Sequence, residues 1–184
     1  MRIEVFPTLL YCYQLENQNQ IKEKVENYYD KHKDESATPN EWNCELFTSY
    51  GTNTFPIQEC LDAFNPTLKE FQEETKLFGK IVLTDMWLNV YQKQNWQEKH
   101  VHSPGQWSSV YYVHFDPNEH RATKFHNPIE TLLASNGIKE NCVSPTVKEG
   151  DMVIFPAWLE HAAPMNKSSK LRSTISFNFF IEGN

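Results

Sequence analysis

The feature that most constrains the fold is a two-residue period in the C-terminal half of the chain. In the segment RSTISFNFFI, which starts at residue 172, one face carries Arg172, Thr174, Ser176 and Asn178 and the other carries Ile175, Phe177 and Phe179. Such alternation is typical of a strand with one buried face. Two earlier segments, IVLTDMWLNVYQ and WSSVYYVHF, share this period. The polar face of the last strand either lines a wet interior pocket or faces bulk solvent, and the pattern alone leaves both interpretations open.

Helical spacing replaces this period in the N-terminal part. Apolar residues recur at every third or fourth position in residues 21–32 and again in residues 57–78. The dipeptide Asn65-Pro66 interrupts the second pattern. Proline suits the first position of a helix and asparagine is a good N-cap. We therefore predict two helical pieces that meet near Asn65 and end at Gly79.

The order of these patterns predicts a single domain of 184 residues. Residues 1–79 are expected to form mostly helical support, and residues 80–184 the β core. Residues 1–15 suit an edge strand, where Pro7 is tolerated. Helices first and strands afterwards indicate a mainly β protein with N-terminal supporting helices, and not an alternating βαβ fold. The polar segment 116–149 is expected to be a long loop over the mouth of a barrel.

Composition excludes several functional classes. The formal net charge of -7 makes nucleic acid an unlikely partner, because phosphate neutralisation requires a basic face. No segment resembles a signal peptide, and no apolar run is long enough to span a bilayer. A cytoplasmic protein is therefore expected. Four widely spaced cysteines without a C-x-x-C pair are predicted to be reduced core thiols: Cys12, Cys44, Cys60 and Cys142.

The candidate chemical residues are three histidines and an arginine. His100 and His102 form an H-x-H pair whose rings point to one side of an extended strand, and His161 follows a glycine turn and a further strand. Neutral imidazole suits Fe, Zn, Cu or Ni. Arg172 begins a strand one loop later, and its planar fork favours bidentate capture of a carboxylate, with Thr174 beside it. Spacing alone also permits an exposed polar edge, a hydrogen-bonded loop histidine and a surface salt bridge.

Four stretches in order resemble a known family: WLNVYQ, HVHSPGQWSSVYYVHFDP, GDMVIFPAWLEHAAPMN and LRSTISFN. They are similar to the phage-associated branch of the Fe(II)/2-oxoglutarate-dependent oxygenases. The N-terminal stretch FPTLLY also resembles the opening of that branch. The resemblance implies a double-stranded β-helix, the jelly roll of cupin-like proteins. It also implies a dioxygenase that uses Fe(II), 2-oxoglutarate and O2 to hydroxylate a C–H bond, with release of succinate and carbon dioxide. It points to a prolyl-hydroxylase-like enzyme with a small-molecule or peptidyl substrate, in the host-cell cytoplasm if phage-encoded.

The resemblance also assigns roles to residues. His100 and His161 match two metal histidines, whereas His102 stands where the wider superfamily places an aspartate or glutamate. We expect a three-histidine metal site. The alternatives are that Asp116 supplies a carboxylate, or that two histidines and water hold the metal. Arg172 matches the arginine that binds the far carboxylate of 2-oxoglutarate. Further residues expected in the cofactor pocket are Thr174, Tyr112, Asn89 and Asn178.

Two other functional classes stay open at this point. One is a cupin-like metal enzyme or binding protein that needs no 2-oxoglutarate. The other is a non-enzymatic module on a β-barrel scaffold, since a fold does not fix a function. Arg172 distinguishes the first alternative from an oxygenase, because only the oxygenase needs an anion site beside the metal.

Overall fold

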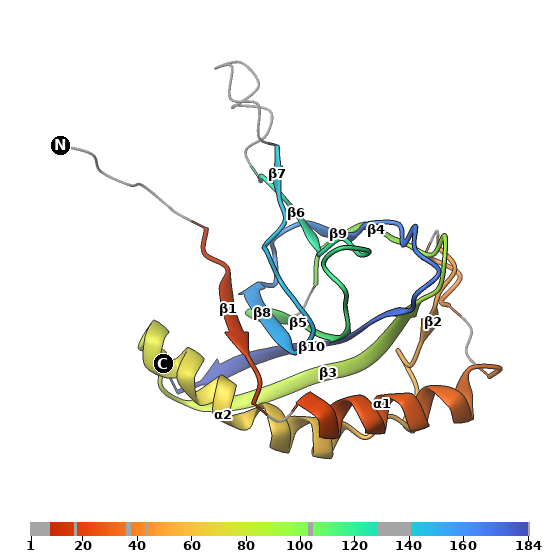
Figure 1. Cartoon of the computed structure of the whole chain (residues 1–184). Helices are drawn as coiled ribbons and strands as arrows, with labels where there is room; N and C mark the ends of the chain where they lie inside the picture. The colour runs from red at the N-terminus through yellow and green to blue at the C-terminus, as the bar shows by residue number, and fades with distance from the viewer. Residues whose placement is uncertain are drawn as a thin grey trace.

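The computed structural model describes residues 8–16, 18–35, 38–42, 44–102, 105–128 and 141–183. Within these residues the chain forms two antiparallel sheets and two helices (Figure 1). The larger sheet contains six strands, in the order β1 (Tyr11–Gln14), β8 (Asp151–Pro156), β5 (Trp107–His114), β10 (Arg172–Glu182), β3 (Lys80–Tyr91) and β2 (Phe47–Thr48). The smaller sheet contains four, in the order β4 (Gln97–His100), β9 (His161–Ala163), β6 (Lys124–His126) and β7 (Cys142–Val143).

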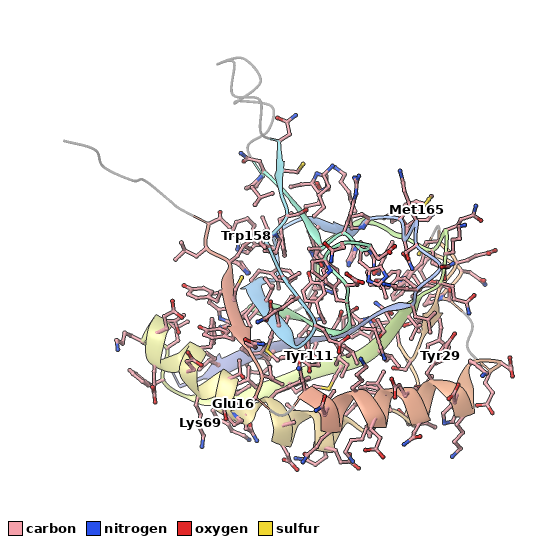
Figure 2. All side chains as sticks on the ribbon, in the orientation of Figure 1. Glu16, Tyr29, Lys69, Tyr111, Trp158 and Met165 are labelled. Atoms are coloured by element: carbon pink, nitrogen blue, oxygen red, sulfur yellow. The ribbon has the colours of Figure 1, made fainter. Side chains whose placement is uncertain are left out.

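The two helices cover one face of the larger sheet (Figure 1). They are α1 (Gln18–His32) and α2 (Ile57–Thr75), and each buries the apolar stripe that its sequence predicts. Phe64 of α2 stacks on Phe177 of β10 with ring centroids 5.4 Å apart, and it contacts Tyr111 of β5 at 5.1 Å. Tyr111 lies in this layer between helices and sheet (Figure 2). Each such buried aromatic ring contributes about 1.5–3 kcal/mol to folding.

The opposite face of the larger sheet turns toward the smaller sheet. A second apolar cluster joins Val110 and Tyr112 of β5 and Phe155 of β8 to Phe125 of β6. Because side chains alternate along β10, its apolar side chains pack against the helices and its polar side chains face the space between the two sheets. This confirms the interior-pocket interpretation of the polar face, and the solvent-exposed interpretation is wrong.

The prediction of two helical pieces meeting near Asn65 is wrong, because α2 continues through Pro66. Proline removes one backbone N–H and so leaves the carbonyl of Asp62 without its helical partner. Pro66 and Asp62 both lie on the exposed face, where water can satisfy that carbonyl. The buried residues on the other face, among them Phe64 and Leu68, hold the helix together across the proline.

The predicted helix end at Gly79 is also wrong. The helix stops at Thr75, and Lys76 adopts the left-handed conformation that often follows a helix end, with φ 60°. Phe78 is 57% exposed and does not belong to the buried stripe. Gly79 instead allows a close approach of two chain segments, since a Cβ at this position would collide with the carbonyl oxygen of Glu182 at the end of β10.

The segment 116–149 is not wholly a loop, because β6 and β7 form within it. The part of the predicted lid between residues 129 and 140 lies outside the described residues.

All four cysteines are free, and Cys44 and Cys60 are buried as predicted. Cys12 is exposed and Cys142 half-buried, so the prediction of core thiols is wrong for these two. Neither helix in the described part of the chain has the length and apolar character needed to cross a bilayer.

Candidate metal centre

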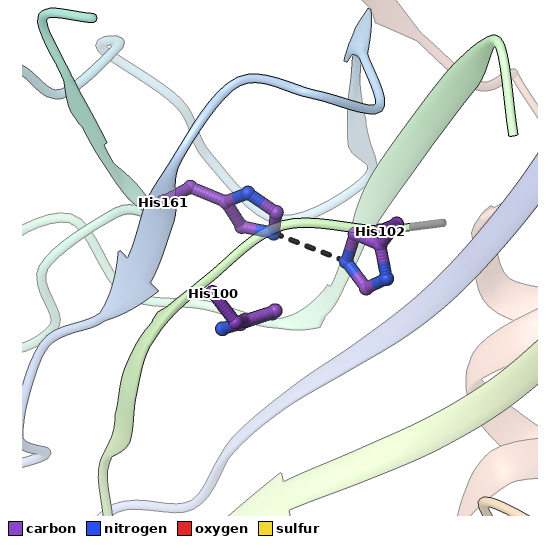
Figure 3. Close-up of side chains that lie close together, drawn as sticks. All are labelled: His100, His102 and His161. Atoms are coloured by element: carbon purple, nitrogen blue, oxygen red, sulfur yellow. Dashed lines mark hydrogen bonds between the residues drawn. The ribbon is translucent and has the colours of Figure 1, made fainter. Parts of the chain in front are cut away.

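Pairing of two short strands brings the three histidines together. His100 ends β4 and His161 begins β9, and these two residues face each other across the antiparallel pair. The chain continues past β4, where the N–H of His102 donates to the carbonyl of Ala157 at 3.0 Å. One ring nitrogen from each of the three histidines lies within 4.8 Å of the other two. Figure 3 shows the three histidine side chains close together. His102 Nε2 lies 3.2 Å from His161 Nε2.

Hydrogen bonds fix the orientation of each ring. His100 Nδ1 donates to the carbonyl of Glu98 at 2.7 Å, and His161 Nδ1 donates to the carbonyl of Leu159 at 2.8 Å. A proton held on Nδ1 leaves the lone pair of Nε2 for a metal ion, as is usual for ligating histidines. His102 is held differently, since its Nδ1 lies 3.3 Å from the side-chain amide of Asn178.

Burial keeps these rings neutral. It lowers the pKa of His161 well below 6.5, lowers that of His102 to about 3 and lowers that of His100 as well. The neighbouring rings add to this effect for His161 and His102. A metal ion competes with protons for imidazole, so a neutral cluster is ready to bind one at neutral pH. Within the described residues, this is the one group of three potential ligands that converge on a point.

The metal-free protein is expected to lose stability as the pH falls from about 6.5 to about 5. In this window the unfolded chain takes up protons on the three histidines, whereas the folded site resists them. The stability is therefore fully present above the unfolded pKa and declines as the pH approaches the folded values. The loss is at most about 2 kcal/mol per histidine, at about 1.36 kcal/mol per pH unit.

Urea unfolding across this pH window measures the effect. His102→Gln removes one of the titrating groups. The free energy of unfolding should therefore fall less steeply with decreasing pH, by up to about 1.36 kcal/mol per pH unit. A free energy of unfolding that stays constant or rises on acidification would contradict the neutral cluster.

A cationic side chain, that of Arg172, lines a cavity that the three histidines also line. Arg172 is only 2% exposed, and its guanidinium lies 4.3 Å from the ring centroid of Tyr91. Its Nη1 donates to the carbonyl of Arg121 at 3.0 Å, whereas its buried Nη2 has no hydrogen-bond partner in the described part of the protein. Burial lowers the pKa of Arg172, yet a guanidinium stays charged at neutral pH. A buried unpaired donor is costly, so this site is suited to an anion.

The cavity connects the arginine to the histidines. Its walls include His100, His102, His161 and Arg172 together with Tyr112 and Thr174. The Tyr112 hydroxyl donates to Thr123 at 2.9 Å, and that contact fixes the tyrosine against the cavity. With a volume of about 30 Å³ the cavity is small, so a dicarboxylate has to displace a lining side chain, and exposed Arg121 has the room to move.

The structure places the other predicted residues outside this cavity. Asn89 does not line it; its amide donates to the Tyr91 hydroxyl at 3.4 Å and so supports the ring beneath Arg172. Asn178 joins His102 to Asp85, whose Oδ1 accepts from the amide at 2.7 Å. Asp116 pairs with Lys170 at 2.7 Å and is not a member of the histidine group.

Several wall residues were not predicted from the sequence. Trp87, Tyr91 and Ser176 lie on strand faces that the two-residue period had already marked, so that period was the signal for them. Gln97 and Arg121 come from segments whose sequence shows no such pattern.

Comparison with known proteins gives a family and a fold. Residues 85–178 match the model of the family described as "Putative 2OG-Fe(II) oxygenase". No curated protein sequence matches the chain. Among solved structures, a Pseudomonas putida prolyl-4-hydroxylase is similar over 96% of this chain and 94% of its own, with a TM-score of 0.62 and 10% identity.

Two further structures carry the same fold. AviO1 from Streptomyces viridochromogenes is similar over 96% of this chain and 91% of its own, with a TM-score of 0.68 and 12% identity. HygX from Streptomyces hygroscopicus, whose structure holds nickel and 2-oxoglutarate, is similar over 95% and 84%, with a TM-score of 0.62 and 9% identity. These likenesses confirm the predicted double-stranded β-helix with supporting helices.

Proposed function

The chain belongs to the 2OG-Fe(II) oxygenase family, and we propose that it hydroxylates a C–H bond of a small-molecule or peptidyl substrate. The family requires Fe(II) and 2-oxoglutarate, and the residues present fit both. The observation that carries the proposal is the unpartnered Nη2 of Arg172, which is buried in the same cavity as three neutral histidines. A dicarboxylate bound to a metal ion needs a metal site, here the three histidines, and beside it a cationic side chain for its far carboxylate, here Arg172.

The metal would be held by His100, His102 and His161. Imidazole nitrogen is a good ligand for Fe(II), and the carbonyls of Glu98 and Leu159 already orient two of the rings. A site of three neutral ligands carries less negative charge than one with two histidines and a carboxylate. The protein therefore leaves the charge of Fe(II) to be balanced by the bound 2-oxoglutarate.

The far carboxylate of 2-oxoglutarate would bind Arg172, with the Thr174 hydroxyl on the same strand face. Tyr112 supports this end of the cavity through Thr123. The bound iron would supply the oxidising chemistry, in which O2 and 2-oxoglutarate yield succinate, carbon dioxide and a hydroxylated substrate. The protein's own part is to orient the cosubstrate and to exclude water from the space between the sheets.

Finer assignments follow from the motifs. We propose a prolyl-hydroxylase-like enzyme of the phage-associated branch that acts in the cytoplasm, which is the host-cell cytoplasm if the protein is phage-encoded. Support comes from the ordered motifs and from the fold shared with the Pseudomonas putida prolyl-4-hydroxylase.

Oxygen-dependent succinate formation tests the proposed reaction. With ascorbate as reductant, the iron-loaded protein should convert 2-oxoglutarate to succinate slowly by itself and faster with its substrate, in a panel of peptides and small metabolites. Omission of Fe(II) or O2 should stop both rates. If protein that has bound Fe(II) and 2-oxoglutarate forms no succinate with any member of the panel, the proposed reaction is wrong.

A further inference from the structure

A second cavity adjoins the histidines. It has a volume of about 200 Å³ and shares His100, His102, Trp87 and Gln97 with the arginine cavity. Its remaining walls are formed by Trp42, Tyr50, Asp85, Glu98, Val101 and Asn178. The histidine cluster therefore stands between a cavity that contains Arg172 and one that contains two acidic side chains.

Aromatic rings form a continuous row along this second cavity. Trp42 lies 5.4 Å from Tyr50, Tyr50 lies 5.3 Å from Trp87, and Trp87 lies 5.5 Å from His102, all measured between ring centroids. Tyr50, between Trp42 and Trp87, is 45% exposed, whereas Trp87 is 3% exposed beside the histidines. The buried indole Nε1 of Trp87 has no partner among the described residues. Aromatic faces attract cations, and an open row of rings leads such a group toward the metal centre.

The charged residues of the wall have one sign. Asp85 and Glu98 line the cavity, and no lysine or arginine among the described residues does. Asn178 fixes the Asp85 carboxylate by donating to Oδ1, but no ion pair balances Asp85 within the described chain. Burial raises the pKa of Asp85, as expected for a carboxylate without a cation beside it. By contrast, the surface carboxylate of Asp116 is paired with Lys170.

From these features, and resting on the proposed function, we propose that this cavity binds the substrate and that the substrate carries an alkylammonium group, so that the likeness to prolyl hydroxylases lies in the fold and the motifs and not in the substrate. The ammonium is held by Asp85 and Glu98 against the faces of Trp87 and Tyr50, which places its alkyl chain beside the histidines. The cavity volume of about 200 Å³ suits an extended side chain. The acidic wall also repels 2-oxoglutarate, so each charged ligand is directed to its own side of the metal.

Isothermal titration calorimetry tests the proposed ammonium site without requiring turnover. The probes are free lysine, Nα-acetyl-lysine methylamide and n-butylammonium, and the neutral comparators are the norleucine and proline analogues of the second probe. Each is titrated into anaerobic protein loaded with Fe(II) and 2-oxoglutarate, and into metal-free protein. At least one ammonium probe should bind at least about tenfold more tightly than either neutral comparator. Preference for the acetylated probe would identify a peptide as the source, and preference for free lysine a metabolite.

Asp85→Asn keeps the shape of the side chain and removes its charge. It should weaken ammonium binding by about tenfold. Asp62→Asn, on the exposed face of α2, should have no effect. Equal affinities for ammonium and neutral probes, or an Asp85→Asn variant that binds like the unaltered protein, would overturn the proposal.

The two proposals can fail separately. If ammonium binding is sensitive to Asp85→Asn but no succinate forms, the proposed reaction fails and the cation site stands. If succinate formation is stimulated by a neutral probe and not by an ammonium probe, only the cation site fails.

Discussion

Replacement of His161 by alanine should lower the affinity for Fe(II) by at least about 100-fold, because changes to residues that merely support a ligand already cost 10–100-fold. His161 is buried, its Nδ1 is fixed by the carbonyl of Leu159, and its Nε2 points at the other two rings. The measurement is an anaerobic Fe(II) titration in the presence of 2-oxoglutarate, followed by the visible charge-transfer band. His161→Gln serves as a second variant that leaves less empty space.

The matched control is His114→Ala. His114 contacts Ser173 and Glu26, away from the cluster, so this variant should bind Fe(II) like the unaltered protein. His102→Ala tests whether three histidines or two hold the metal, and a loss comparable to that of His161→Ala is expected. His102→Asp should keep Fe(II), because a carboxylate completes the more common set of ligands. A folded His161→Ala variant that binds Fe(II) with unchanged affinity would exclude His161 as a ligand.

Replacement of Arg172 by alanine should weaken 2-oxoglutarate binding by at least about 100-fold and leave Fe(II) affinity nearly unchanged. Removal of one partner of a buried charge pair costs about 3–5 kcal/mol, which corresponds to more than two powers of ten. Arg172→Lys keeps the charge but loses the planar fork, so its affinity should lie between those of the other two proteins. The 2-oxoglutarate concentration at half-maximal band intensity measures this effect.

Lys170→Ala is the control for the arginine. Lys170 lies two residues away on the surface, paired with Asp116, and its removal should not change 2-oxoglutarate binding. If Arg172→Ala binds 2-oxoglutarate as well as the unaltered protein does, the anion site is elsewhere, and a cupin-like metal protein becomes the better account.

The sequence predicted the parts of the fold that depend on a regular period. Alternation in β10 assigned Arg172 and Thr174 to one face and Phe177 to the other, because a strand reverses its side chains at every residue. Helical spacing placed Phe64 in the core for the same kind of reason. The helix break predicted at Pro66 does not occur, because propensity describes a helix in isolation, whereas packing on the large sheet holds α2 together in the protein.

The site was less predictable because it depends on pairing between distant segments. His100 and His161 meet only because β4 pairs with β9, and strands this short carry no period. The H-x-H spacing and the family motifs predicted the three histidines. They did not predict the contact of Asn178 with His102 or the ion pair between Asp116 and Lys170. Trp42 and Tyr50 reach the second cavity from a connection whose sequence predicts no structure.

The central claim is that three histidines and Arg172 form one site for Fe(II) and 2-oxoglutarate. Anaerobic titration of the unaltered protein with both ligands tests it most directly. We expect a visible charge-transfer band that requires both ligands together and saturates at one equivalent of Fe(II). If calorimetry shows that both ligands bind and no band forms, they do not share a site, and that result would contradict the account.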